Sequence, residues 1–163
     1  MNLYIVRHAE AVSLGDGVQS DFDRTLTDRG RADASMLARA LAQIDLDIQA
    51  VLSSPLVRAV ETSNIFGREL MRDPQTTRQL EPGFNQRLLV EEILSRSTSA
   101  GIVAIGHQPD VGMLISYLIS PAHAATVAME TSAIACLNLL STGSAQLRWL
   151  LTPETVRRMN FVL

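Results

Sequence analysis

The stretch Leu-Tyr-Ile-Val-Arg-His-Ala-Glu at residues 3–10 decides the fold of this chain, because four apolar residues run directly into an arginine, a histidine and a carboxylate. A short apolar run that ends in polar residues is typical of a buried strand. In open α/β sheets, ligands bind at the carboxyl ends of the strands. The stretch therefore predicts a central strand that presents Arg7 and His8 at a binding edge.

The rest of the chain alternates strand patterns with helical ones. Further strands are predicted at 48–53, 76–80 and 102–105, and helices at 28–43, 55–70, 85–96 and 109–120. Ser54 is the expected N-cap of the second helix and Pro55 its first residue. The polar segment 11–28 is long for a connection, and such loops beside a strand end tend to line binding sites.

Residues 132–139 and 145–150 alternate in polarity around a Gly-containing turn, which predicts an antiparallel hairpin. We therefore expect an α/β protein with a single domain over residues 1–163. Its architecture should be a three-layer α/β/α sandwich, with a mostly parallel central sheet and an antiparallel C-terminal hairpin.

Composition limits the classes of function. The net charge of −3 argues against general nucleic-acid binding, which usually needs a basic face. No apolar window approaches the roughly 20 residues that span a bilayer, and the N-terminus lacks the pattern of a signal peptide. The single Cys136 can form no internal disulfide and no thiolate cluster for zinc. We expect a cytoplasmic protein that binds neither nucleic acid nor membranes.

Basic side chains follow three of the predicted strands. Arg7 and His8 end the first, Arg58 comes just after the second, and His107 follows the strand at 102–105. Because parallel strands end at one edge of a sheet, these four side chains can converge. Arginine presents a planar fork of donors that matches phosphate oxygens in pairs. The pattern therefore predicts a site for a phosphoryl group.

His8 has the features of a nucleophile in such a site. Two arginines beside it disfavour the imidazolium form, so the ring is expected to be neutral. A backbone carbonyl could hold the proton on one ring nitrogen and leave the other free to attack. The chain contains no lysine, which excludes a Walker-A lysine, a Schiff base and a lysine general base.

Five sequence blocks follow one another along the chain: RHAE at 7–10, RxLTxxG at 24–30, SSPxxRAxxT at 53–62, GHxP at 106–109 and TSAIA at 131–135. Together they resemble the histidine phosphatase superfamily, and in particular its SixA-type phosphohistidine phosphatases, which share the phosphoglycerate mutase-like fold. The resemblance covers residues 4–149. Arg-His alone is a weak signal, but five blocks in order are specific.

The resemblance implies a role for each of these residues. His8 would take the phosphoryl group as a phosphohistidine, while Arg7 and Arg58 clamp its oxygens. His107 would donate a further hydrogen bond to the same group as its charge spreads in the transition state. Arg24 would be an additional phosphate or substrate contact. Neither a metal ion nor another cofactor is implied.

The chain departs from the family pattern at two positions. Ala9 stands where many members have glycine, a small change that an approaching substrate can tolerate. Members that cleave phosphate esters use a carboxylate after the third strand to protonate the alkoxide leaving group. Glu81 lies near that position, but the Leu-Glu-Pro pattern at 80–82 resembles the SixA type, which lacks this acid. Glu81 is therefore either a general acid or a turn residue.

Three other polar residues have simpler interpretations than catalysis. Glu10 is a loop residue or an arginine partner rather than a second catalytic carboxylate, and His123 is a surface histidine in a predicted loop. Asp110 opens a helix, where a carboxylate interacts favourably with the helix dipole. A zinc deaminase is excluded because His8-Ala9-Glu10 has no accompanying Pro-Cys-x-x-Cys.

We expect a metal-independent phosphatase, acting as a monomer through phospho-His8. Its substrate would be phosphohistidine on a signalling protein such as a histidine phosphotransfer domain. A protein substrate is favoured because no insertion large enough to form a lid precedes the third strand. One alternative is a small-molecule phosphomonoesterase of the same superfamily that uses Glu81 as its acid, and another is a non-catalytic module that binds phosphorylated residues.

Overall fold

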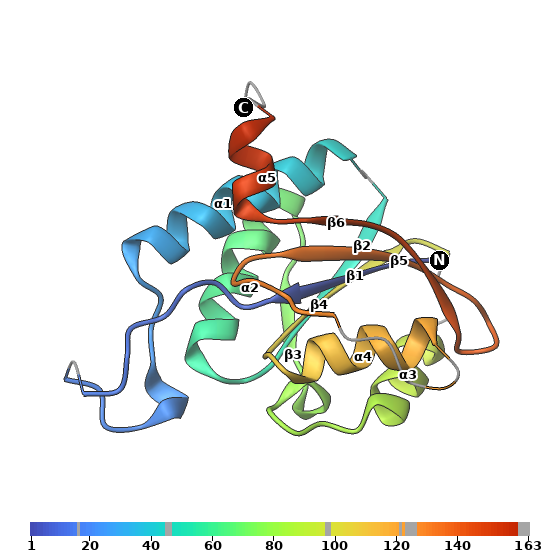
Figure 1. The fold of residues 1–163 in the computed structure, drawn as a ribbon, viewed down its shortest axis with the longest axis horizontal. Coiled ribbons are helices and arrows are strands. Elements are labelled where there is room, and N and C mark those ends of the chain that lie inside the picture. The colour runs from blue at the N-terminus through green and yellow to red at the C-terminus, as the bar shows by residue number, and fades with distance from the viewer. Residues whose placement is uncertain (16, 45–46, 97–98, 121, 123–126, 160–163) are drawn as a thin grey trace.

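The computed structural model describes residues 1–15, 17–44, 47–96, 99–120, 122 and 127–159 (Figure 1). Its strands are β1 (Asn2–Arg7), β2 (Ile48–Ser53), β3 (Pro74–Thr76), β4 (Gly101–Gly106), β5 (Ile134–Leu139) and β6 (Ala145–Leu151). Its α-helices are α1 (Asp28–Ile44), α2 (Val57–Leu70), α3 (Gln86–Ser95), α4 (Asp110–Ile119) and α5 (Pro153–Arg158). Two short 3-10 helices are η1 (Asp21–Asp23) and η2 (Arg78–Leu80).

The strands form one mixed sheet in the order β3-β2-β4-β1-β5-β6. The first four run parallel to one another, and this arrangement needs crossover connections that here contain helices. β5 pairs antiparallel with β1, and β6 pairs antiparallel with β5. The sheet confirms the predicted α/β class, with a mostly parallel sheet and an antiparallel C-terminal hairpin.

The helices cover both faces of the sheet, so each face has its own hydrophobic core (Figure 1). Along β1, Leu3 and Ile5 point into the core formed with α3 and α4. The alternate residues Tyr4 and Val6 point into the core formed with α1, α2 and α5. All four side chains are almost fully buried. This two-sided burial explains why β1 is a continuous apolar run rather than an alternating one.

The strand order brings three segments of the predicted site to one edge. β4 lies between β1 and β2, and the ends Arg7 and Ser53 pair with β4 at Gly106 and Ile105. The pairing extends one residue beyond the strands, because the His8 amide donates to the Gly106 carbonyl at 2.9 Å. The residues that follow β1, β2 and β4 therefore begin side by side.

The second helix begins later than the sequence predicts. It starts at Val57 rather than at Pro55, and Leu56 is extended at φ −65° and ψ 138°. The reason is that the Ser54 amide still donates to the Ile105 carbonyl of β4, at 3.0 Å. The chain therefore leaves the sheet only after Ser54, and that serine does not cap the helix.

Two other elements also differ from the prediction. The third strand lies earlier than the predicted 76–80, because β3 spans Pro74–Thr76 and is followed by η2. The Thr77 side chain accepts a hydrogen bond from the Gln79 amide at 3.2 Å, which favours the tight turn. Helix α5 is not among the predicted elements, although Thr152 as its N-cap and Pro153 at its start are recognisable signals.

The start of α1 packs closely under the loop that follows β1. The Thr27 amide donates to the Glu10 carbonyl at 3.0 Å, and the Thr27 hydroxyl accepts from the Gly30 amide at 3.0 Å. A Cβ atom on Gly30 would lie 2.1 Å from the Glu10 carbonyl oxygen. Glycine at this position therefore allows the helix to approach the backbone just beyond His8.

Gly30→Ala is expected to lower the free energy of unfolding by about 1–3 kcal/mol, because the added methyl group would push helix and loop apart. Urea denaturation measures the change. The matched control is Arg29→Ala in the same turn, whose side chain is 73% exposed and whose loss should cost less than about 0.5 kcal/mol. Equal stabilities of Gly30→Ala and the wild type would contradict the close approach.

Candidate active site

Arg7 and His8 stand at the end of β1, where the backbone is held from both sides. On one side, the His8 amide donates to β4. On the other, the Arg7 amide donates to the Ala133 carbonyl at 3.2 Å, and the Ser132 amide donates to the carbonyls of Arg7 and His8 at 3.2 and 3.3 Å. The segment before β5, part of the fifth sequence block, therefore fixes the chain beneath the side chains of Arg7 and His8.

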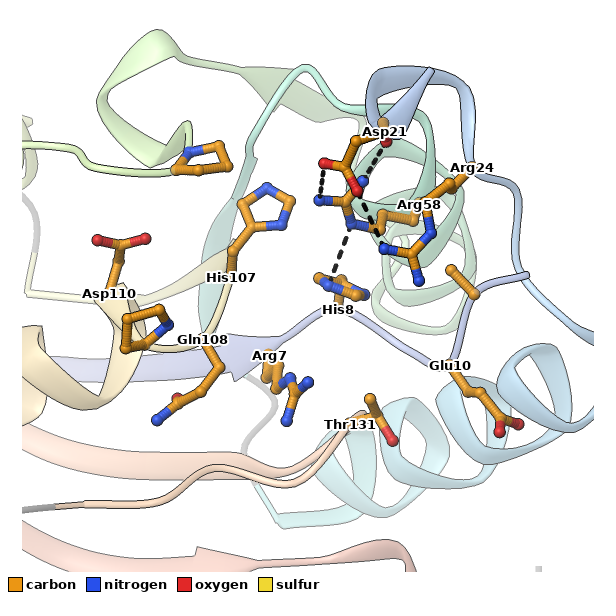
Figure 2. A pocket seen from close by; sticks show the side chains of 13 residues that line it. Arg7, His8, Glu10, Asp21, Arg24, Arg58, His107, Gln108, Asp110 and Thr131 are labelled. Carbon is orange, nitrogen blue, oxygen red and sulfur yellow. Dashed lines mark hydrogen bonds and ion pairs between the residues drawn. The ribbon is translucent and has the colours of Figure 1, made fainter. Parts of the chain in front are cut away.

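A cavity of about 480 Å³ opens at this edge of the sheet (Figure 2). Five of the six site residues predicted from the sequence line it, namely Arg7, His8, Arg24, Arg58 and His107. The remaining lining residues come from four loops and helix starts and are Glu10, Ala11, Asp21, Pro82, Gln108, Pro109, Asp110 and Thr131. The parallel strand ends thus bring together residues that are up to a hundred positions apart in the chain.

The contacts of His8 define which ring nitrogen carries the proton. Nδ1 lies 2.7 Å from the Ala9 carbonyl oxygen, and a carbonyl can only accept, so Nδ1 carries the proton. Nε2 therefore has the lone pair, and it accepts a hydrogen bond from Arg58 Nε at 3.2 Å. His8 is held in the tautomer that points its basic nitrogen toward the arginine.

Burial is the main reason that His8 is neutral. Burial, together with the smaller effects of three nearby arginine side chains, lowers the pKa of His8 to about 4, against the opposing effect of the backbone hydrogen bond to Ala9. The sequence predicts the neutral ring from the arginines alone, but burial has the larger effect. The pKa of His107 is lowered to about 3, by burial and then by His8 and Arg58.

Arg58 lies in the first turn of α2 and is only 4% exposed. While its Nε contacts His8, its two terminal nitrogens donate to Asp21, Nη1 to the backbone carbonyl and Nη2 to the carboxylate at 2.9 Å. A cation in the first turn of a helix opposes the helix dipole. Asp21 supplies the anion that offsets this cost.

Asp21 is a site residue that the sequence pattern does not single out. Its carboxylate also accepts from Arg24 Nη1 at 3.0 Å, and hydrogen bonds from Arg24 and Arg58 hold the pKa of Asp21 below its usual value. Figure 2 shows the carboxylate between the two guanidinium groups. The available signal was its position in the long polar loop after β1, which indicates a region but no single residue.

Arg24 is tied to its own loop. Its Nε donates to the Val12 carbonyl at 2.6 Å while its Nη1 contacts Asp21. Thr62 links α2 to the loop after β1. Its hydroxyl donates to the Arg58 carbonyl at 2.7 Å and accepts from the Ala9 amide at 3.1 Å. The residues that carry the sequence motifs therefore also hold one another in place.

Glu81 is the one predicted site residue that the structure does not bring to the cavity. Its side chain is 42% exposed and forms a loose ion pair with Arg78 at 3.8 Å. Its neighbour Pro82 lines the cavity instead. In this arrangement, the residue after the third strand contributes no carboxylate to the site.

The other polar candidates have mixed outcomes. Glu10 lines the cavity, but its carboxylate accepts from the Thr27 hydroxyl at 2.9 Å rather than from an arginine. Asp110 is 8% exposed, lines the cavity, and accepts from the Gly83 amide at 3.1 Å. It therefore joins the start of α4 to the turn after η2. His123 lies outside the described residues.

Within the described part of the chain, no group of three or more histidine, cysteine or carboxylate side chains is arranged to hold a metal ion. No helix among these residues is both long and apolar enough to cross a membrane. The polar side chains that line the cavity carry imidazole, guanidinium and carboxylate groups, together with the amide of Gln108 and the hydroxyl of Thr131.

Known proteins share both the sequence and the fold of this chain. The family model of the histidine phosphatase superfamily, branch 1, matches residues 3–82. An uncharacterized protein of Picosynechococcus is 36% identical over 115 residues, which cover 69% of each chain. The phosphohistidine phosphatase SixA of Escherichia coli is 29% identical over 157 residues, which cover 94% of each chain.

A solved structure of the protein histidine phosphatase SixA in complex with tungstate superposes on this chain with a TM-score of 0.85. The two sequences are 27% identical, and the match covers 96% of this chain and 99% of the other. The likeness thus extends over nearly the whole fold, including the region after residue 82 that supplies His107.

His8 is expected to titrate with a pKa of about 4 in NMR spectra of the folded protein. Folding lowers this pKa from the ordinary value of 6.5, so between these values the unfolded chain binds more protons. The corresponding contribution to stability is complete above about pH 6.5 and is lost as the pH falls toward 4. The same resonance in urea gives the reference, and coincident folded and unfolded titrations would refute the prediction.

Proposed function

Because this chain belongs to the histidine phosphatase superfamily, we propose that it hydrolyses its substrate through a phosphohistidine formed on His8. Membership of the family identifies the chain as a phosphatase. The observation that carries the assignment of His8 is its tautomer, because Nδ1 is bound to the Ala9 carbonyl, so that Nε2 carries the lone pair and presents it to Arg58. A neutral imidazole in an arginine-lined cavity combines a nucleophile with anion-binding groups.

In the first step, His8 Nε2 forms a bond to phosphorus and the bond from phosphorus to the leaving group breaks. The Arg58 guanidinium, which contacts Nε2, turns its donors toward the phosphoryl oxygens. In the second step, a water oxygen bonds to phosphorus, the bond to Nε2 breaks, and the protons of that water leave with the phosphate. His8 returns to its neutral form.

Two buried nitrogen atoms of cavity-lining residues have no partner among the described residues, namely Arg7 Nε and His107 Nδ1, and one oxygen, Gln108 Oε1, is in the same position. Buried hydrogen-bonding groups are normally paired, so each such atom needs an explanation. Oxygens of a phosphoryl group on His8 would accept hydrogen bonds from the two nitrogens. This supports the roles that the family resemblance implies for Arg7 and His107.

The preferred substrate is proposed to be phosphohistidine. Phosphate esters release an alkoxide, which needs a proton from a general acid, whereas phosphohistidine releases an imidazole that needs less help. The position of Glu81 outside the cavity fits a phosphatase without that acid. The name of the Escherichia coli relative, phosphohistidine phosphatase, agrees with this preference.

The phosphohistidine is proposed to lie on a cytoplasmic signalling protein, such as a histidine phosphotransfer domain. Only residues 71–73 connect α2 to β3, so no lid arises at this point of the fold. Phe22 beside Asp21 is 48% exposed, and Met113, one turn after Asp110, is 52% exposed. Apolar side chains next to two walls of the cavity fit a partner that is larger than a free metabolite.

The decisive experiment compares a radiolabelled histidine phosphotransfer domain with a small ester, p-nitrophenyl phosphate, at equal enzyme concentration. The wild type should release phosphate from the domain much faster, and acid quenching should trap acid-labile phosphate on the enzyme. His8→Ala should form no phosphoenzyme and lose at least about 10³-fold in rate. Rapid ester cleavage without domain dephosphorylation would overturn the substrate assignment, and a labelled His8→Ala enzyme would overturn the nucleophile.

Glu81→Gln tests the small-molecule alternative. Because the carboxylate pairs with Arg78 outside the cavity, the substitution should change neither phosphohistidine nor ester hydrolysis by more than about twofold. Steady-state kinetics at pH 7 measure both activities. A selective loss of ester hydrolysis on the order of 100-fold would instead identify Glu81 as a general acid. Failure of the wild type to form any phosphoenzyme would favour a binding module.

A further inference from the structure

A buried serine contacts the second histidine of the site. Ser54 Oγ lies 2.8 Å from His107 Nε2, and Ser54 and His107 are 0% and 3% exposed. The serine belongs to the SSPxxRAxxT block, and its predicted role as a helix cap is not observed. Its hydroxyl group is therefore available for another role.

The hydrogen bonds around Ser54 indicate the direction of this contact. The Leu56 amide donates to Ser54 Oγ at 3.3 Å, so that oxygen already accepts one hydrogen bond. A serine hydroxyl has one proton to donate. Among the described residues, the acceptor found for it is His107 Nε2. With Ser54 as the donor, a chain of donors runs from the Leu56 amide through the Ser54 hydroxyl to the imidazole.

The direction of this hydrogen bond determines whether the other nitrogen of His107, Nδ1, carries the proton. If Nε2 accepts, the proton of the neutral ring must be on Nδ1, which is buried and has no partner among the described residues. The rings of His107 and His8 are 5.0 Å apart, and Figure 2 shows the His107 ring directed toward His8 and Arg58. Nδ1 is therefore the nitrogen left to meet a phosphoryl group on His8.

We propose that Ser54 is a positioning residue, which fixes His107 in the tautomer with the proton on Nδ1 and so keeps a hydrogen-bond donor aimed at the phosphoryl group. The opposite tautomer would point a lone pair at anionic oxygens. The catalytic consequence rests on the proposed function, whereas the tautomer itself does not. The low pKa of His107, about 3, agrees with a ring that is neutral and must be held in one tautomer.

Long-range ¹H–¹⁵N NMR spectra of the ¹⁵N-histidine-labelled protein distinguish the two tautomers directly. The wild type should show His107 protonated on Nδ1. Ser54→Ala should shift the ring toward protonation on Nε2, and Ser54→Thr, which keeps the hydroxyl, should restore the wild-type pattern. The matched control is Ser53→Ala, because the neighbouring Ser53 is equally buried but donates to the Ser54 carbonyl at 2.8 Å.

With phosphohistidine as substrate, Ser54→Ala should lower kcat on the order of 100-fold with little change in KM, and Ser53→Ala should not. The proposal is overturned if wild-type His107 is protonated on Nε2, or if Ser54→Ala leaves the tautomer unchanged. The first of these results needs no variant to fold. A correct tautomer in an enzyme that does not hydrolyse phosphohistidine would instead count against the proposed function.

Discussion

The whole site depends on one constraint, which is that His8 must be buried beside two arginines and still present a lone pair. The Ala9 carbonyl fixes the proton on Nδ1, which leaves the lone pair on Nε2. Burial makes the charged ring unfavourable and so keeps His8 neutral. Arg58 then donates to the unprotonated nitrogen, Nε2. A solvent-exposed histidine would titrate near neutral pH and exchange tautomers, so the same residue types on a surface would not form the proposed nucleophile.

The fold provides this environment through strand order. β4 lies between β1 and β2, so the residues after all three strands meet at one edge. The antiparallel β5 adds a second support, because the segment before it binds the backbone of Arg7 and His8. Thr62 and Gly30 fix the loop just beyond His8 from α2 and α1. The backbone around His8 is thus held by β4, by the segment before β5, and by α1 and α2.

Charge balance links the site to its proposed substrate. Arg58 is buried, and Asp21 supplies the carboxylate that makes its burial tolerable. A phosphoryl group entering the cavity is a second anion for the same guanidinium. The site is therefore already organised around a negative charge, and Arg7 Nε and His107 Nδ1 are buried nitrogens without a partner among the described residues.

The sequence by itself determined the α/β class, the parallel strands and five of the six residues it assigned to the cavity, because strand periodicity and residue types after strands are local properties of the chain. Only the tertiary structure decided which side chains of the site contact one another. Asp21 meets Arg58 across 37 positions and Ser54 meets His107 across 53. Glu81 turns to Arg78 instead of the cavity. Such contacts depend on how loops from different strands pack, and a local pattern carries no information about that packing.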